Sequence, residues 1–101
     1  MESKRLRQND KELFFHWLMD FYRGTIYGEI CSFVRENESF DLEDVIQDIQ
    51  IKIWDKLQYI YRSKNKKAYL RRFVKNTCLD MARKKARRPV IYFYDDFGDF
   101  A

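Results

Sequence analysis

Two adjacent stretches of the chain carry opposite charges, and each is suited to a different kind of contact. Residues 62–88 contain twelve Lys or Arg and a single acid, Asp80. The stretch before it, DLEDVIQDIQIKIWDKL at residues 41–57, places most of its acids near its start. A dense group of cations attracts phosphates, whereas exposed carboxylates suit a basic protein surface. The charge pattern therefore predicts one nucleic-acid contact and one protein contact.

The basic stretch has the residue types that bind a nucleic-acid strand. Lys66 and Lys67 would stand in the first turn of a helix, where the helix dipole disfavours cations unless an anion is bound there. Further along, cations can contact phosphates and Asn76 can hydrogen-bond a base edge. A merely solvated face is the alternative, but the net charge of +11 in residues 62–88 favours binding. By itself this pattern indicates only a polyanion binder, and its candidate binding residues are Lys66, Lys67, Arg71, Arg72, Lys75, Asn76, Arg83 and Lys84.

The residues that usually carry catalysis or hold metals are sparse. His16 is the only histidine, and its neighbours Phe15 and Trp17 favour a packing or surface role. Two cysteines, Cys31 and Cys78, have no CxxC spacing, so we expect two buried thiols in a reducing compartment. There is also no glycine-rich phosphate loop. We therefore expect no enzyme activity, no metal and no cofactor.

The composition favours a helical fold that positions these residues. Hydrophobic residues make up 46% of the chain, while three Gly and one Pro leave little material for the turns of a β fold. Apolar residues recur every three or four positions from Asp10 to an interruption at Gly24 and again over residues 25–37. In the first of these segments, the shared face is predicted from Leu13, Phe14, Trp17, Leu18, Phe21 and Tyr22.

Two further helices should carry the charged stretches. Asp41 is a good N-cap, Phe40 and Val45 have the spacing of a hydrophobic staple, and this helix should run to Tyr61. Its buried stripe is predicted to be Leu42, Val45, Ile46, Ile49, Ile53, Leu57 and Ile60. After a short polar connection, Asn65 should cap a helix that stops by Arg88 because Pro89 follows. The expected fold is all-α, a compact bundle of about four helices.

The domain organisation follows from these segments. We expect a flexible N-terminus at residues 1–9, one helical domain at residues 10–88, and the start of an interdomain linker at residues 89–101. The sequence contains no apolar stretch of about 18 residues, which a membrane-spanning helix requires. The first ten residues lack the apolar core of a signal peptide. We therefore expect a cytoplasmic protein without membrane insertion.

Two motifs in order resemble region 2 of bacterial sigma factors of the extracytoplasmic-function group, in the sigma-70-like family. The first is the acidic start DLEDVIQD, with Trp54 seven residues after Gln47. The second is YLRRFVKNTCLDMAR at residues 69–83, followed by a basic cluster and Pro89. The resemblance covers about residues 10–90 and implies a helical bundle of the sigma region 2 type.

The resemblance also implies partners for both charged stretches. In the family, the acidic helix docks on the clamp helices of the RNA polymerase β′ subunit. The matching positions here are Asp44, Gln47, Asp48, Ile51 and Trp54. The basic helix traps the non-template strand of the melted promoter −10 element, and Asn76 matches a family asparagine with Arg71, Arg72 and Lys75 beside it. The implied base-pocket loop is Ile60, Tyr61, Arg62, Ser63, Lys64 and Asn65. An anti-sigma factor is a further implied partner.

Two other functions remain open at this stage. One is a small basic helical regulator that binds DNA or RNA, and the other is an interaction module that binds polymerase or an anti-sigma factor without melting DNA. The family's second domain, which reads the −35 element, is not among these 101 residues. We expect the chain to be an excised domain rather than a minimal factor.

Overall fold

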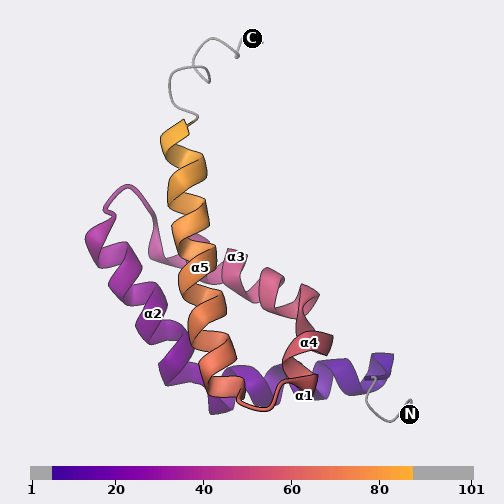
Figure 1. Cartoon of the computed structure of the whole chain (residues 1–101). Coiled ribbons are helices and arrows are strands. Elements are labelled where there is room, and N and C mark those ends of the chain that lie inside the picture. Colours follow the sequence, from indigo (N-terminus) through magenta and orange to yellow (C-terminus); the bar gives the residue numbers. More distant parts are fainter. Residues whose placement is uncertain (1–5, 88–101) are drawn as a thin grey trace, which may run out of the picture.

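The computed structural model describes residues 6–87, and every regular element in this range is a helix. The elements are α1 (Gln8–Phe21), α2 (Arg23–Glu36), α3 (Leu42–Asp55), α4 (Leu57–Arg62) and α5 (Lys66–Arg87). In the view of Figure 1, α5 rises between α2 and α3, while α1 runs along the base. The all-α prediction is confirmed. Of the N-terminus predicted at residues 1–9, residues 1–5 lie outside the described residues, Leu6 is buried and α1 begins at Gln8. The linker predicted at 89–101 lies outside the described residues.

The first break in the chain falls at Tyr22, not at Gly24 as predicted. Tyr22 has φ −103° and ψ 23°, so it ends α1, and Gly24 lies within the first turn of α2. The backbone N–H of Tyr22 still donates to Leu18 O at 3.0 Å, and Ile26 N–H donates to Tyr22 O at 3.0 Å. The two helices are thus joined through one non-helical residue without a loop.

The predicted third helix is two helices, because Lys56 interrupts it with φ −104° and ψ 16°. A contact distant in sequence accompanies this break. The side chain of Gln58, in α4, accepts a hydrogen bond from Leu6 N–H at 3.2 Å and donates one to Leu6 O at 3.3 Å. Bending at Lys56 turns α4 toward the N-terminal segment, and Leu57 and Ile60 remain fully buried.

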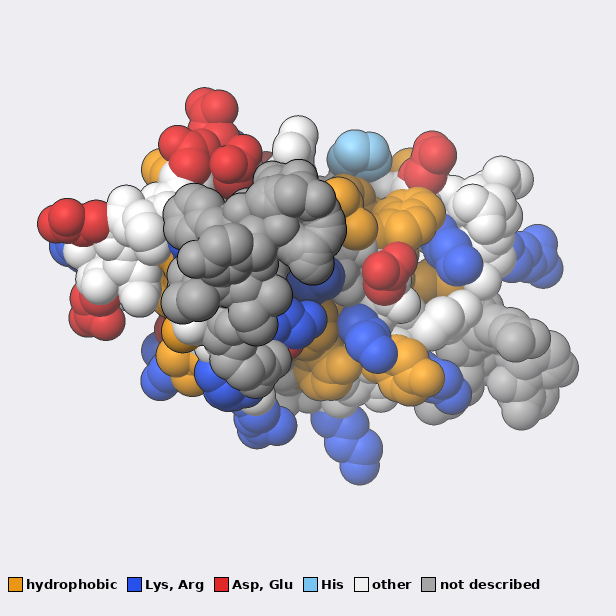
Figure 2. Space-filling view, turned by 90° about the horizontal axis from the view of Figure 1, so that it is seen from above, with side chains coloured by type: hydrophobic (Ala, Val, Ile, Leu, Met, Phe, Trp, Pro, Cys, Tyr) orange, Lys and Arg blue, Asp and Glu red, His pale blue; other side chains and the backbone are white. Residues whose placement is uncertain are grey.

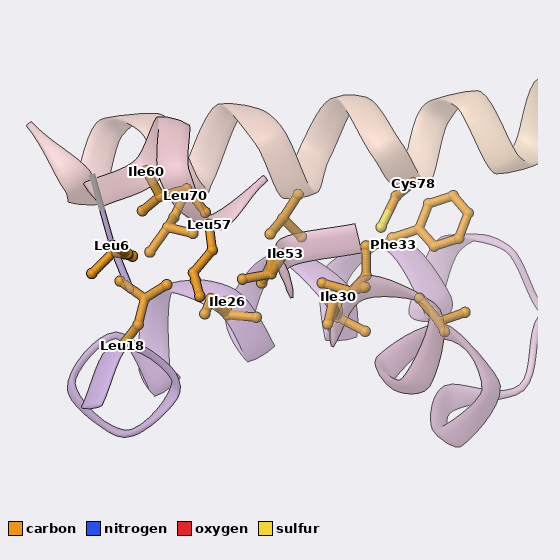
Figure 3. Packing of buried hydrophobic residues seen from close by; sticks show 13 residues of the cluster. Leu6, Leu18, Ile26, Ile30, Phe33, Ile53, Leu57, Ile60, Leu70 and Cys78 are labelled. Atoms are coloured by element: carbon orange, nitrogen blue, oxygen red, sulfur yellow. The ribbon is translucent and has the colours of Figure 1, made fainter. Parts of the chain in front are cut away.

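One hydrophobic core joins all five helices. Figure 3 shows the side chains of α2 lying below α5, with Phe33 beside Cys78. At the end of the core away from Phe33 and Cys78, a second group of side chains brings Leu6 and Leu18 together with α4 and the start of α5. The buried residues are Leu6, Leu18, Ile26, Ile30, Phe33, Val45, Ile49, Ile53, Leu57, Ile60, Leu70, Val74 and Cys78. Burying this much apolar surface is the main force that fixes the helices relative to one another.

Several predicted core residues are exposed. Leu42 is 39% exposed, since it opens α3 and faces away from the core. In α1 only Leu18 is fully buried, whereas Leu13 and Phe21 are 71% and 65% exposed.

Cys31 is also exposed, so the prediction of two buried thiols is wrong for that residue. Burial raises the pKa of the Cys78 thiol to about 11, and the charge of Glu29 adds to this shift.

Candidate nucleic-acid and protein interfaces

The basic helix α5 is held in place at both ends. At its start, the Asn65 side chain accepts a hydrogen bond from Ala68 N–H at 3.0 Å, which confirms the predicted cap. Near its end, Lys85 Nζ donates to Ser39 O at 2.8 Å and lies 4.5 Å from the centre of the Phe40 ring. The helix is therefore tied to the connection between α2 and α3, and its outward side has a fixed direction.

The predicted DNA-binding residues divide between two sides of α5. Arg72, Asn76 and Arg83 stand four and seven residues apart, so they form one line on the outward side. All three line a hollow of about 590 Å³, together with Lys84. The described residues around this hollow come from α5 and from α3, which contributes Lys52. The sequence placed Lys52 with Asp44, Gln47 and Asp48 on the protein-facing side of its helix, whereas the structure places it at this hollow.

Arg71 and Lys75 lie on the other side of α5, toward α2. The Nε atom of Arg71 is 3.6 Å from a carboxylate oxygen of Glu29. Lys75 lines a second hollow of about 350 Å³, whose walls include Glu29 and Glu36. These two cations face carboxylates of their own domain on the α2 side, and the structure does not group them with Asn76. Within the hollow that Asn76 lines, Arg83 and Lys84 pair with Asp80 at 3.3 and 3.5 Å.

The first-turn lysines also differ from each other. Lys66 is half-buried, and its Nζ donates a hydrogen bond to Ser63 O at 3.0 Å, so its ammonium group closes the connection before α5. Lys67 is exposed. The prediction that both lysines face an anion at the helix end fits the geometry of Lys67 alone.

The predicted base-pocket loop is shorter than expected, because α4 extends to Arg62. Ile60 is completely buried, so it supports the loop from the core and presents no surface to a base. Tyr61 is half-buried, with its ring edge-on to Phe14 at a centroid distance of 5.2 Å. Ser63 Oγ donates to Ile60 O at 2.7 Å. Of the predicted loop, Arg62, Lys64 and Asn65 are exposed.

Tyr59 is an exposed aromatic residue beside this loop that the sequence prediction did not include. Its ring is 56% exposed and lies between two cations, with Lys56 Nζ at 5.3 Å and the Arg62 guanidinium carbon at 5.9 Å from its centre. Their spacing of three residues on either side was the available signal. A ring between cations can stack on a base while the cations meet its phosphates.

The predicted protein-binding residues share one side of α3. The Asp41 side chain accepts a hydrogen bond from Asp44 N–H at 3.3 Å, which confirms the predicted cap. Asp44, Gln47, Asp48 and Ile51 are all exposed, and Ile51 is 58% exposed. Trp54 stands at the edge of this side, half-buried and edge-on to Phe15 at 5.4 Å. Asp55, four residues after Ile51, is also exposed and was not among the predicted residues.

The two charges are separated on the surface as well as in the sequence. In Figure 2, Lys and Arg side chains gather along the lower edge of the molecule, and several Asp and Glu side chains cluster at the upper left. Among residues 6–87, no three His, Cys, Asp or Glu side chains lie together in a way that could hold a metal ion. None of the helices in that range is long and apolar enough to cross a membrane.

Of the comparisons with known proteins, the one with family models finds a match. No curated protein and no solved structure matches the chain. Residues 18–88 match the family model of Sigma-70 region 2, and this range contains α2, α3, α4 and α5 with both charged surfaces. Sigma-70 region 2 is the sigma-factor domain that binds RNA polymerase and promoter DNA in transcription initiation, and it is not an enzyme family. The matched range is well over half of the chain, and the protein therefore belongs to the Sigma-70 region 2 family.

Proposed function

We propose that this chain is the region 2 domain of an extracytoplasmic-function sigma factor, which traps the melted −10 strand of a promoter on α5 while α3 docks on the polymerase. The observation that carries the proposal is the line of Arg72, Asn76 and Arg83 on the outward side of α5. It places one base-reading amide between two cations. Such an order suits a strand whose phosphates flank a captured base.

Single-stranded DNA is the form of nucleic acid that this surface suits best. Opening a duplex costs a few kcal/mol per unstacked base, and a domain without an energy source must recover that cost from contacts with the open strand. Cations along the hollow bind the phosphates, while Tyr59 offers an exposed ring for stacking. Stacking contributes about 1–3 kcal/mol per base, which is enough to hold a strand that is already open.

The exposed side of α3 suits a protein partner. Ile51 supplies an exposed apolar contact, and Asp44, Asp48 and Asp55 stand around it on the same side. An apolar centre with a charged rim is typical of protein interfaces. We propose that the β′ clamp helices of the polymerase bind here through basic side chains. A specific anti-sigma factor that covers the same side would act as an inhibitor.

Base preference in the presence of polymerase core tests the proposal. A pool of labelled single-stranded oligonucleotides with one randomised −10-length segment is bound by the complex, and the bound sequences are read. Asn76→Ala should remove the preference at one position, worth about 1–3 kcal/mol of discrimination. Arg35→Ala, at an exposed cation on α2, is the matched control and should leave the preference intact. Equal affinity for duplex and single strand would favour a duplex-binding regulator and contradict the proposal.

A further inference from the structure

Three large apolar side chains form an exposed line on α1. Leu13, Trp17 and Phe21 are spaced by four residues, and their exposed fractions are 71%, 46% and 65%. We call these three residues the α1 row. The Trp17 ring stacks on Phe21 with centroids 5.2 Å apart and on Phe14 at 5.8 Å. Exposed apolar groups of this size on a soluble domain mark interaction sites, and the stacking holds this one in a fixed arrangement.

The α1 row lies outside the acidic side of α3 and outside the larger hollow. The α3 side meets α1 through Trp54 and Phe15, and Phe15 lies about 160° around the helix from Trp17 at about 100° per residue. The described residues of the larger hollow come from α3 and α5. The row approaches the predicted base-pocket loop only through Phe14, which stacks on Trp17 and contacts the edge of Tyr61.

We propose that the α1 row docks an amphipathic α-helix of a partner protein whose apolar stripe is bordered by Lys or Arg. The charges beside the row select this occupant. Asp10 and Asp20 are exposed and lie within about 60° of the row around the helix. They repel phosphates of nucleic acid and anionic lipid. In a second copy of this chain, packing row against row would also bring these carboxylates together. A basic helix meets both the apolar row and the acids.

A second feature, at the start of α2, is compatible with a helical partner. Gly24 and Gly28 lie one turn apart at the start of α2, beginning three residues after Phe21, and both are exposed. A Cβ added at either position would meet nothing within 4 Å, so packing inside the domain does not require glycine there. Glycine within a helix is destabilising relative to alanine. Glycines four residues apart do, however, allow another helix to approach the backbone closely.

Trp17 fluorescence tests the proposal directly. The chain has two tryptophans, so Trp54→Phe leaves Trp17 as the only reporter. The probe is a synthetic helical peptide of about 18 residues with leucines every three or four positions and lysines beside them. A second peptide carries glutamates in place of the lysines. We expect a saturable blue shift with the lysine peptide and at least about tenfold weaker binding of the glutamate peptide. No shift, or equal affinities, would overturn the proposal.

Matched variants separate docking from folding. Leu13→Ser and Phe21→Ser should each weaken the lysine peptide about tenfold or more. Leu79→Ser removes an exposed leucine (47% exposed) from α5, away from the row, and should change nothing. Gly28→Leu should block the peptide without lowering the thermal unfolding temperature. Loss of polymerase-core affinity in Phe21→Ser would assign the row to the polymerase contact and overturn the proposal. Concentration-dependent dimers of the intact chain that Phe21→Ser abolishes would do the same.

Discussion

Helices α3 and α5 have the same construction with opposite exteriors. Each begins with a side-chain cap, Asp41 or Asn65, and each buries an apolar stripe in the shared core. Outward, α3 exposes carboxylates around Ile51, whereas α5 exposes cations around Asn76. Because one core fixes both helices, opposite charges are held apart instead of pairing with each other. The domain therefore presents two surfaces of opposite charge in fixed positions.

Lys52 is the exception that defines the border between the two surfaces. It belongs to α3 by sequence, yet its side chain lines the hollow of α5 beside Arg72 and Asn76. One residue earlier, Ile51 points to the acidic side. Consecutive residues on a helix are separated by about 100°, so a single step along α3 is enough to change the surface to which a side chain belongs.

The largest expected effect comes from the core that both surfaces share. Leu70 is fully buried, and Leu70→Ala should lower the free energy of unfolding by about 2–5 kcal/mol. Urea unfolding measures this, with Leu79→Ala as the control, because Leu79 is 47% exposed and should change stability by less than about 0.5 kcal/mol. Polymerase and DNA affinities should fall together at temperatures where the variant begins to unfold. A loss of DNA affinity alone, without a change in stability, would show that the core is not shared.

Charge reversal on α3 should separate the two surfaces. Asp48→Lys places a cation on the acidic side, and we expect affinity for polymerase core to fall about tenfold or more, which corresponds to about 1.4 kcal/mol. The affinity of the free domain for single-stranded DNA should not fall. Glu38→Lys makes the same charge change at an exposed site between α2 and α3 and serves as the control. Equal losses in both variants would show that only net charge matters, and the division between the two helices would then fail.

Some of this fold is local in sequence and was therefore predictable. The caps at Asp41 and Asn65 depend on residues three positions away, and both predictions are confirmed. The break at Lys56 was not predictable in the same way. It accompanies the hydrogen bonds between Gln58 and Leu6, which are 52 residues apart in the chain. Periodicity alone describes a continuous helix, since it carries no information on such distant contacts.

The site shows the same division. Asp44, Asp48 and Ile51, which the resemblance assigned to the polymerase contact, share one exposed side of α3. Helical spacing could not tell that Arg71 faces Glu29 on α2, because the sequence does not show which neighbour lies on each side of α5. For the same reason the apolar face of α1 was predicted as core, although two of its members are mostly exposed. Spacing shows which residues share a face, and only tertiary packing shows what covers it.

The two caps provide a matched comparison of a smaller size. Asp41→Ala and Asn65→Ala should each lower the free energy of unfolding by about 0.5–2 kcal/mol, measured by urea unfolding. Asn65→Ser should restore most of the stability, since a serine hydroxyl can also accept the Ala68 N–H bond. Asn65 additionally lies in the predicted base-pocket loop. If Asn65→Ser recovers stability but not strand affinity, the asparagine has a second role in the loop, and the two caps are not equivalent.

The smallest effect concerns the two sides of α5. For single strands, each phosphate contact contributes about 0.7 to the slope of log affinity against log salt. Arg72 lines the hollow beside Asn76, so Arg72→Ala should reduce the slope by about that amount. Arg71 lies 3.6 Å from Glu29, so Arg71→Ala should leave the slope almost unchanged. Titrations of single-stranded DNA at several salt concentrations measure both slopes. An equal reduction in both variants would mean that the strand also crosses the α2 side of α5, where Glu29 must then release Arg71 to a phosphate.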